Sequence, residues 1–297
     1  AAGVIPQSVI VAFSVGAFVF LASILYTIFT TKENPPEDLN QFHAEKKESR
    51  FIPDLVVSLK EMPSTMKKLG LIQFFSWFAF FTMWSLSTPA LTEHVFHSPK
   101  PDVKEFAKLD DKGAVLKNSN EEVIFLDSSK EQEYQTKDKV YNNAADLVGS
   151  ATGVYGLSSM VFALLLTFYT LKNKINRKYI HMASLILGGL GFIYMFYATP
   201  ETLMYSFILI GFSWGSILSM PYAMLSSSVN PNKMGMMMGL FNMFIVIPQI
   251  IAALGGINYL YKLIGEAHIN AMLLAGLLLI IAGLCNFFIT DKNAISG

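Results

Sequence analysis

The sequence contains only one cysteine, Cys285, and few charged residues for its length. A single cysteine excludes an internal disulfide and any metal site built from several thiolates. Charged residues make up 15% of the 297 residues, against ~25% in typical soluble domains, whereas hydrophobic residues make up 53%. The formal net charge is zero, so nothing in the composition indicates nucleic-acid binding or a polybasic surface protein.

Seven stretches lack Asp, Glu, Lys and Arg in their interiors and reach the roughly 20 apolar residues that a helix needs to cross a bilayer. Outer-membrane strands are shorter and alternate in polarity, and soluble core helices would need an amphipathic covering layer. The first stretch lacks the basic start of a signal peptide. We therefore predict an all-α membrane protein with seven transmembrane helices, at residues 3–30, 71–92, 147–171, 178–198, 201–227, 235–261 and 269–290.

The basic residues of the short loops predict the orientation of these spans. Loop 172–178 carries four basic residues and the facing loop 198–202 carries none, so we expect 172–178 in the cytoplasm. Counting spans then places 31–70 and the C-terminus in the cytoplasm and 97–146 outside. Within 31–70, apolar residues on one face predict an amphipathic surface helix. The start at a span without Met suggests a chain that begins mid-protein, although a complete seven-span protein is the alternative.

Polar and aromatic residues recur on one face of several spans, at spacings of three or four. Hydrogen bonding between helices explains any single buried amide about as well as a ligand does. Amides, hydroxyls and flat aromatic rings together, without formal charge, favour a cavity for a neutral polyhydroxylated ligand, because sugar rings stack on Trp and Tyr. An anionic substrate would require Arg or Lys. The predicted substrate-binding residues are Gln73, Trp77, Trp84, Trp214, Tyr222, Asn242 and Gln249.

Two prolines and three glycine pairs predict how the spans bend and cross. Pro221 and Pro248 each remove a helical hydrogen bond in mid-span, as in the interrupted helices of transporters, although membrane helices also tolerate proline elsewhere. Three Gly-x-x-x-Gly pairs predict close helix crossings. They are Gly149/Gly153, Gly211/Gly215 and Gly235/Gly239.

Signals for an enzyme are weak. Residues 211–215 match the nucleophile-elbow pattern, which requires a strand-to-helix turn and here falls inside an apolar helix. An intramembrane serine protease is a minor alternative, because His181 lies near one end of its span and Ser213 near the middle of another. Glu93, His94 and His97 are too few for a convincing metal site. We predict no catalytic residue, metal or cofactor. With no mid-span carboxylate, a proton-titrating acid is expected outside this chain.

Several strings, in order along the chain, resemble the sucrose/maltose-transporter-like branch of the major facilitator superfamily, which is related to the glycoside–cation symporters. They are Met62–Leu69 followed by Gln73, Trp77 and Trp84, then Ser219–Leu225, Met234–Asn242 and Ile247–Ile250. The resemblance covers nearly the whole chain and implies helices 6–12 of a twelve-helix fold. Residues 1–30 would be helix 6, 31–70 the central cytoplasmic loop, 71–290 the C-terminal six-helix bundle with an outer insertion at 97–146, and 291–297 a cytoplasmic tail.

The resemblance also implies a function. It implies sugar transport across the cell (inner) membrane, with the proton as coupling ion and the missing N-terminal helices completing the cavity. Asn176, Arg177 and Lys178 keep the basic end of a degenerate version of the superfamily's cytoplasmic gating motif, whose expected Asp and Gly are absent here. Gly235, Gly239, Pro221 and Pro248 would permit helix crossing and bending. The alternative is a membrane sugar sensor or scaffold that has a transporter-like fold and does not transport.

Overall fold

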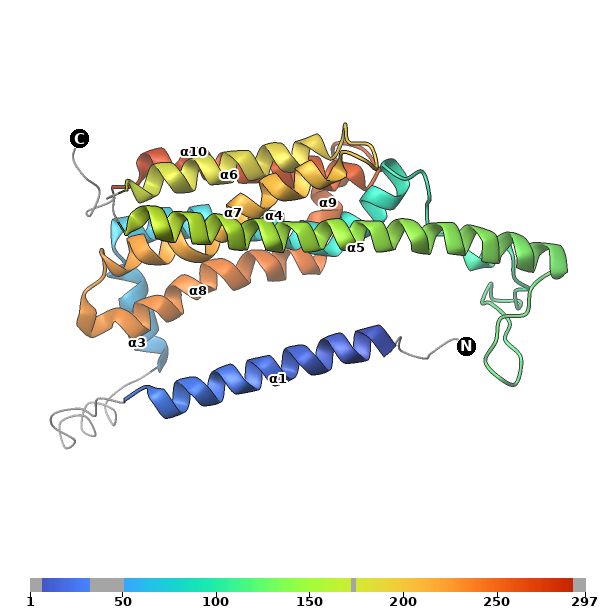
Figure 1. The fold of residues 1–297 in the computed structure, drawn as a ribbon, viewed down its shortest axis with the longest axis horizontal. Coiled ribbons are helices and arrows are strands. Elements are labelled where there is room, and N and C mark those ends of the chain that lie inside the picture. The colour runs from blue at the N-terminus through green and yellow to red at the C-terminus, as the bar shows by residue number, and fades with distance from the viewer. Residues whose placement is uncertain (1–6, 33–50, 172–174, 291–297) are drawn as a thin grey trace. The chain divides into compact units, whose positions relative to one another are not determined.

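The computed structural model describes residues 7–32, 51–171 and 175–290, and regular structure there is helical (Figure 1). Residues 33–50 of the expected central loop and the expected tail 291–297 lie outside the described residues. The helices are α1 (Gln7–Thr30), α3 (Phe51–Lys60), α4 (Ser64–His94), η1 (Val103–Glu105), α5 (Ser128–Thr170), α6 (Arg177–Tyr194), α7 (Leu203–Ser226), η2 (Pro231–Lys233), α8 (Met234–Ile251), the π-helix η3 (Ala252–Gly256), α9 (Ile257–Lys262), α10 (Ile269–Cys285) and η4 (Asn286–Phe288).

The all-α membrane fold is confirmed. Six helical stretches among the described residues are long and apolar enough to cross a membrane: Val9–Thr30, Ser64–His94, Ser128–Thr170, Leu203–Ser226, Met234–Lys262 and Ile269–Phe288. The remaining expected span, 178–198, forms the 18-residue helix α6. It begins with two basic residues and carries a histidine in its second turn, which makes it less apolar than the others.

The chain forms two compact units, Ala1–Val56 with Lys117–Ile124, and Val57–Leu116 with Phe125–Gly297. In the first unit, α1 is exposed along its length, as expected of a helix that faces lipid. Toward the end of α1, hydroxyls bond within the helix: Ser23 donates to the Val19 carbonyl and Thr27 to the Ser23 carbonyl.

The second unit is a helical bundle in which α6 packs between α7 and α10, α10 packs on α4, and α5 packs on α7. Glycines permit the closest of these approaches. A Cβ added to Gly189 of α6 would lie 2.7 Å from the Gly276 carbonyl oxygen of α10. A Cβ added to Gly211 of α7 would lie 2.5 Å from the Tyr155 carbonyl oxygen of α5. The predicted crossing at Gly211/Gly215 is therefore present, between α5 and α7.

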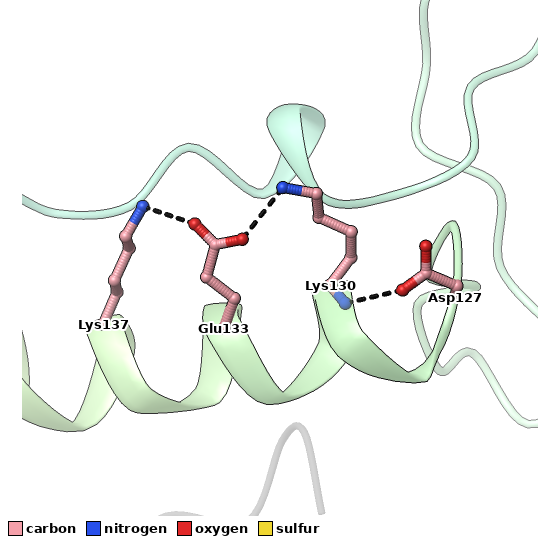
Figure 2. A network of polar contacts seen from close by, with 4 residues as sticks. All are labelled: Asp127, Lys130, Glu133 and Lys137. Atoms are coloured by element: carbon pink, nitrogen blue, oxygen red, sulfur yellow. Dashed lines mark hydrogen bonds and ion pairs between the residues drawn. The ribbon is translucent and has the colours of Figure 1, made fainter.

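Helix α5 has 43 residues and is roughly 65 Å long, well beyond the predicted span of 147–171. The charged segment before that span continues the helix because Asp127 caps it and charged side chains pair along it. The Asp127 carboxylate accepts from the Lys130 backbone N–H at 2.8 Å. Glu133 binds Lys130 at 2.8 Å and Lys137 at 2.9 Å (Figure 2). These two hydrogen bonds lower the pKa of Glu133 from 4.5 to about 2.

The last third of the bundle contains a broken helix. Pro248 lies inside α8, and the chain then passes through the π-helix η3 before α9 begins at Ile257. Gly255 has φ 104°, a conformation that glycine adopts without strain. The predicted span 235–261 is therefore three helical pieces in series.

Candidate functional site

Aromatic side chains from α4 and α7 form one cluster. Trp77 and Trp84 lie seven residues apart on α4, which places them on one face two turns apart. Their ring centroids are 6.1 Å apart, and Trp214 of α7 lies 5.5 Å from Trp77 and 5.3 Å from Trp84. Phe80 lies 4.9 Å from Trp214. The structure thus brings together the three tryptophans predicted from the sequence, although they come from two helices.

Helix α5 contributes a polar contact at the edge of this cluster. The Trp84 indole N–H donates to the Tyr155 hydroxyl at 3.3 Å, and the Tyr155 ring lies 6.3 Å from that of Trp214. Trp84 is 41% exposed, whereas Phe80 is fully buried. The cluster therefore has a buried side, formed by Phe80, and an accessible side at Trp84.

Buried polar atoms without partners lie beside the cluster on α4. Gln73 is fully buried, and both its amide nitrogen and its amide oxygen lack a hydrogen-bond partner among the described residues. The indole N–H of Trp77, one turn further on, is also buried and unpartnered. Buried polar groups in proteins are nearly always hydrogen-bonded, so this turn of α4 has unused capacity for a ligand or water.

The other predicted binding residues lie apart from the tryptophan cluster. The Tyr222 hydroxyl of α7 donates to Asn242 Oδ1 of α8 at 3.0 Å. The Gln249 amide donates to the Ile245 carbonyl one turn earlier in α8. The structure therefore gives one aromatic cluster with Gln73, one Tyr–Asn pair, and a glutamine bonded within its own helix.

The cluster has no formal charge in its walls. Residues 69–92 of α4 and all of α7 lack Asp, Glu, Lys and Arg. Phe80 is the cluster residue that the sequence analysis missed, because a phenylalanine in an apolar span carries no polar signal.

The predicted gating and packing residues are placed as follows. The Arg177 guanidinium donates to the Ala223 carbonyl at 2.6 Å and to the Ser227 hydroxyl at 3.2 Å, so it ties the start of α6 to the end of α7. Pro221 and Pro248 are buried inside α7 and α8. A Cβ added to Gly235 or Gly239 would meet no described atom within 4 Å, so their role in helix crossing stays a prediction.

Comparison with known proteins gives one family. A family model described as Major Facilitator Superfamily matches residues 134–295, more than half of the chain. No curated protein matches the chain.

Proposed function

The chain belongs to the major facilitator superfamily, and we propose that it works in a secondary active transporter that carries a neutral sugar by proton symport. It is a multi-pass membrane protein of a family whose members are generally transporters rather than enzymes. The substrate we propose is a di- or oligosaccharide such as sucrose or maltose, as in the sucrose/maltose-transporter-like branch that the sequence resembles.

The observation that carries this proposal is the uncharged aromatic cluster with an unpartnered amide beside it. Trp84 is partly exposed, and the C–H face of a sugar ring would stack on its indole. Gln73 and Trp77 hold buried donors and one buried acceptor that a sugar hydroxyl would satisfy. A buried amide that bonds only to the correct ligand gives specificity, because a ligand without that hydroxyl leaves it unpaired.

The absence of charged residues from α7 and from residues 69–92 of α4 favours an uncharged ligand. A carboxylate or phosphate substrate would enter a site without a cation, and the desolvation of its charge would oppose binding. A polyol loses only hydroxyl hydration, which the amide, the indole N–H and the Tyr222–Asn242 pair would replace. We assign Gln249 a lesser role, since its amide already bonds within its helix.

Transport would follow from rocking of two helical halves about a mid-membrane site. We propose that the second unit is the C-terminal half, that the N-terminal helices complete the cavity, and that 31–70 and the C-terminus lie in the cytoplasm of a cell (inner) membrane protein. Arg177 would hold α6 and α7 together as one moving body, because it bonds across their ends.

The test of the binding site is tryptophan fluorescence of the purified full-length protein, titrated with sucrose, maltose and glucose. A sugar that stacks on the cluster will change the emission, and the difference between wild type and Trp214→Phe isolates the cluster's share. Gln73→Ala will weaken the response. An unchanged response in both Gln73→Ala and Asn242→Ala would show that the site is assigned to the wrong residues.

A further inference from the structure

Unpartnered polar atoms also occur on α6 and at the end of α10. Among the described residues, His181 is the only buried side chain that can carry a charge near neutral pH. Its Nδ1 is hydrogen-bonded to the Ser216 hydroxyl of α7 at 2.8 Å, and its Nε2 has no partner. Asn286, 1% exposed at the end of α10, has an Oδ1 without a hydrogen-bond partner among the described residues.

Helix register places His181 opposite Asn286. A Cβ added to Gly188 of α6 would overlap Ser213 and would lie 3.1 Å from Leu279 of α10. His181 lies seven residues, or two turns, before Gly188 on α6. Asn286 lies seven residues after Leu279, at the end of α10. Because α6 and α10 run in opposite directions, both steps lead toward the same end of the bundle.

Helix α4 brings Gln73 and Ser76 to the same level. Glu93 near the end of α4 bonds His268 just before α10 at 2.8 Å, which fixes the register of these antiparallel helices. Counting the same number of residues forward from His268 along α10 and backward from Glu93 along α4 leads to Asn286 and to the turn Gln73–Ser76. The Gln73 amide and the Ser76 hydroxyl are both buried without partners. By this helix register, polar groups of α4, α6, α7 and α10 lie at about the same level of the bundle.

We propose that His181 is a proton-binding residue of the transport cycle, with Ser216, Asn286 and Gln73 as the hydrogen-bond partners of its charged form. This inference rests on the proposed proton symport and locates a titrating group within this chain, where the sequence analysis expected none. A neutral imidazole donates one hydrogen bond and accepts one, whereas the imidazolium donates from both nitrogens. Ser216 Oγ accepts one of those hydrogen bonds, and the free amide oxygens, directly or through water, accept the other.

The charges around His181 explain why such a proton would be released again. Among the described residues, the charged residues at this end of α6 and α4 are Arg177 and Lys178 on α6 and Lys67 and Lys68 on α4, all of them basic. Helices α7 and α10 carry no charged residue. An imidazolium in the closed bundle therefore has dipoles but no counter-charge, and burial opposes it. Protonation is favoured when the bundle admits water and opposed when it closes, so proton binding follows the conformational change.

The proton balance is simple. A hydronium ion gives its proton to the Nε2 lone pair, so one O–H bond breaks and one N–H bond forms. The Nδ1–H stays on its nitrogen and donates a hydrogen bond to Ser216 Oγ. Release breaks the Nε2–H bond and returns the proton to water on the other side of the membrane.

The test compares driven and undriven transport by the full-length protein in proteoliposomes, with labelled maltose or sucrose. In wild type we expect accumulation under an inward proton gradient and a pH-dependent sugar exchange without one. His181→Gln keeps a hydrogen-bonding side chain but binds no proton, so accumulation will fall to the level without a gradient while exchange continues and loses its pH dependence. Asn286→Leu will reduce accumulation in the same direction, and it carries the test if His181→Gln does not fold.

Ser206→Ala is the matched control for Ser216→Ala, because both residues are buried serines of α7 and Ser206 lies ten residues nearer the start of the helix. Ser216→Ala will reduce accumulation and Ser206→Ala will not. Full gradient-driven accumulation by both His181→Gln and Asn286→Leu would overturn the proposal. Absence of any sugar exchange in wild type would instead contradict the sugar-transport proposal.

A measurement without sugar keeps the two proposals separate. Imidazole nitrogen resonances of the ¹⁵N-histidine-labelled protein, assigned by comparison with His181→Gln, will show a fraction of His181 gaining a proton as the pH is lowered from about 8 to the lowest pH at which the protein stays folded. A His181 signal that stays neutral across that range would overturn the proposal even if transport is observed.

Discussion

Trp77 of α4 and Trp214 of α7 meet edge to face, with ring centroids 5.5 Å apart and ring planes at 73°. Edge-to-face aromatic pairs add about 0.5–1.5 kcal/mol beyond the area they bury. The contact therefore fixes α4 against α7 at the point where Gln73 and the Trp77 N–H lack partners. Packing and ligand binding would share one set of side chains.

Gln73→Leu separates these two roles. The substitution removes a buried amide that has no partner, so it will leave the thermal stability of the sugar-free protein unchanged or raise it, by about 1–3 kcal/mol at most. Sugar uptake will fall, because the amide would no longer bond a hydroxyl. The measurements are thermal unfolding in detergent and initial uptake rate in proteoliposomes.

Thr82→Val is the control for this substitution. Thr82 is also fully buried on α4, but its hydroxyl already donates to the Phe78 carbonyl at 2.8 Å. The Thr82→Val substitution will therefore leave sugar uptake close to that of wild type. A Gln73→Leu protein that is destabilised yet transports normally would mean that the amide has a structural partner and no role in binding.

Gly211 is predicted to be the least replaceable glycine of α7. A Cβ there would lie 2.5 Å from the Tyr155 carbonyl oxygen and 2.6 Å from Ser158 Cβ, so Gly211→Val will push α5 away from α7. Overpacking of this kind costs about 1–3 kcal/mol, and thermal unfolding will show the loss. Gly239→Val on α8, where an added Cβ meets nothing within 4 Å, will cost less. Equal losses would contradict the crossing described for α5 and α7.

Arg177→Met tests the tie between α6 and α7. It keeps most of the aliphatic stem and removes the hydrogen bonds to the Ala223 carbonyl and the Ser227 hydroxyl. A cation at a helix C-terminus also favours the helix dipole. We expect a loss of about 1–2 kcal/mol in thermal unfolding.

Lys233→Met is the comparison for Arg177→Met. Lys233 forms an exposed ion pair with Glu61, and exposed pairs contribute about 0–1 kcal/mol. If Lys233→Met lost as much thermal stability as Arg177→Met, the hydrogen bonds of Arg177 would contribute no more to stability than an exposed ion pair.

The ion pairs of Glu133 predict that the first part of helix α5 loses stability in acid. Its pKa is lowered from 4.5 to about 2 by hydrogen bonds from Lys130 and Lys137. A depressed carboxyl pKa contributes stability that is present above 4.5 and lost as the pH falls toward 2. Hydrogen-exchange protection factors of residues 128–146 will therefore decline in that window. Glu133→Gln will already show reduced protection above pH 4.5 and a smaller decline, whereas Glu131→Gln will behave as wild type.

The apolar spans were predictable because a helix in lipid satisfies its own backbone and needs only length and apolarity. Apolarity alone did not predict the length of α5. Residues 128–146 are helical because Asp127 caps the helix and Lys–Glu pairs stabilise it. Apolarity also did not predict the break at Gly255, because a positive φ leaves no trace in hydropathy.

The tryptophans were predictable as a group, because heptad spacing joins Trp77 and Trp84 on one face of α4 and Trp214 has a similar character. The contacts of Phe80 and the level shared by His181 and Asn286 depend on how α4, α6, α7 and α10 align. Sequence spacing within one helix contains no information on that alignment.

The most direct test of the account is the uptake of labelled sucrose, maltose and glucose by the full-length protein in proteoliposomes, with and without an inward proton gradient. The account predicts that one of these sugars accumulates above its external concentration only when the gradient is present. Binding without accumulation would contradict transport and favour a sugar sensor. If no sugar were bound or taken up, the tryptophan cluster and Gln73 would have a role in helix packing alone.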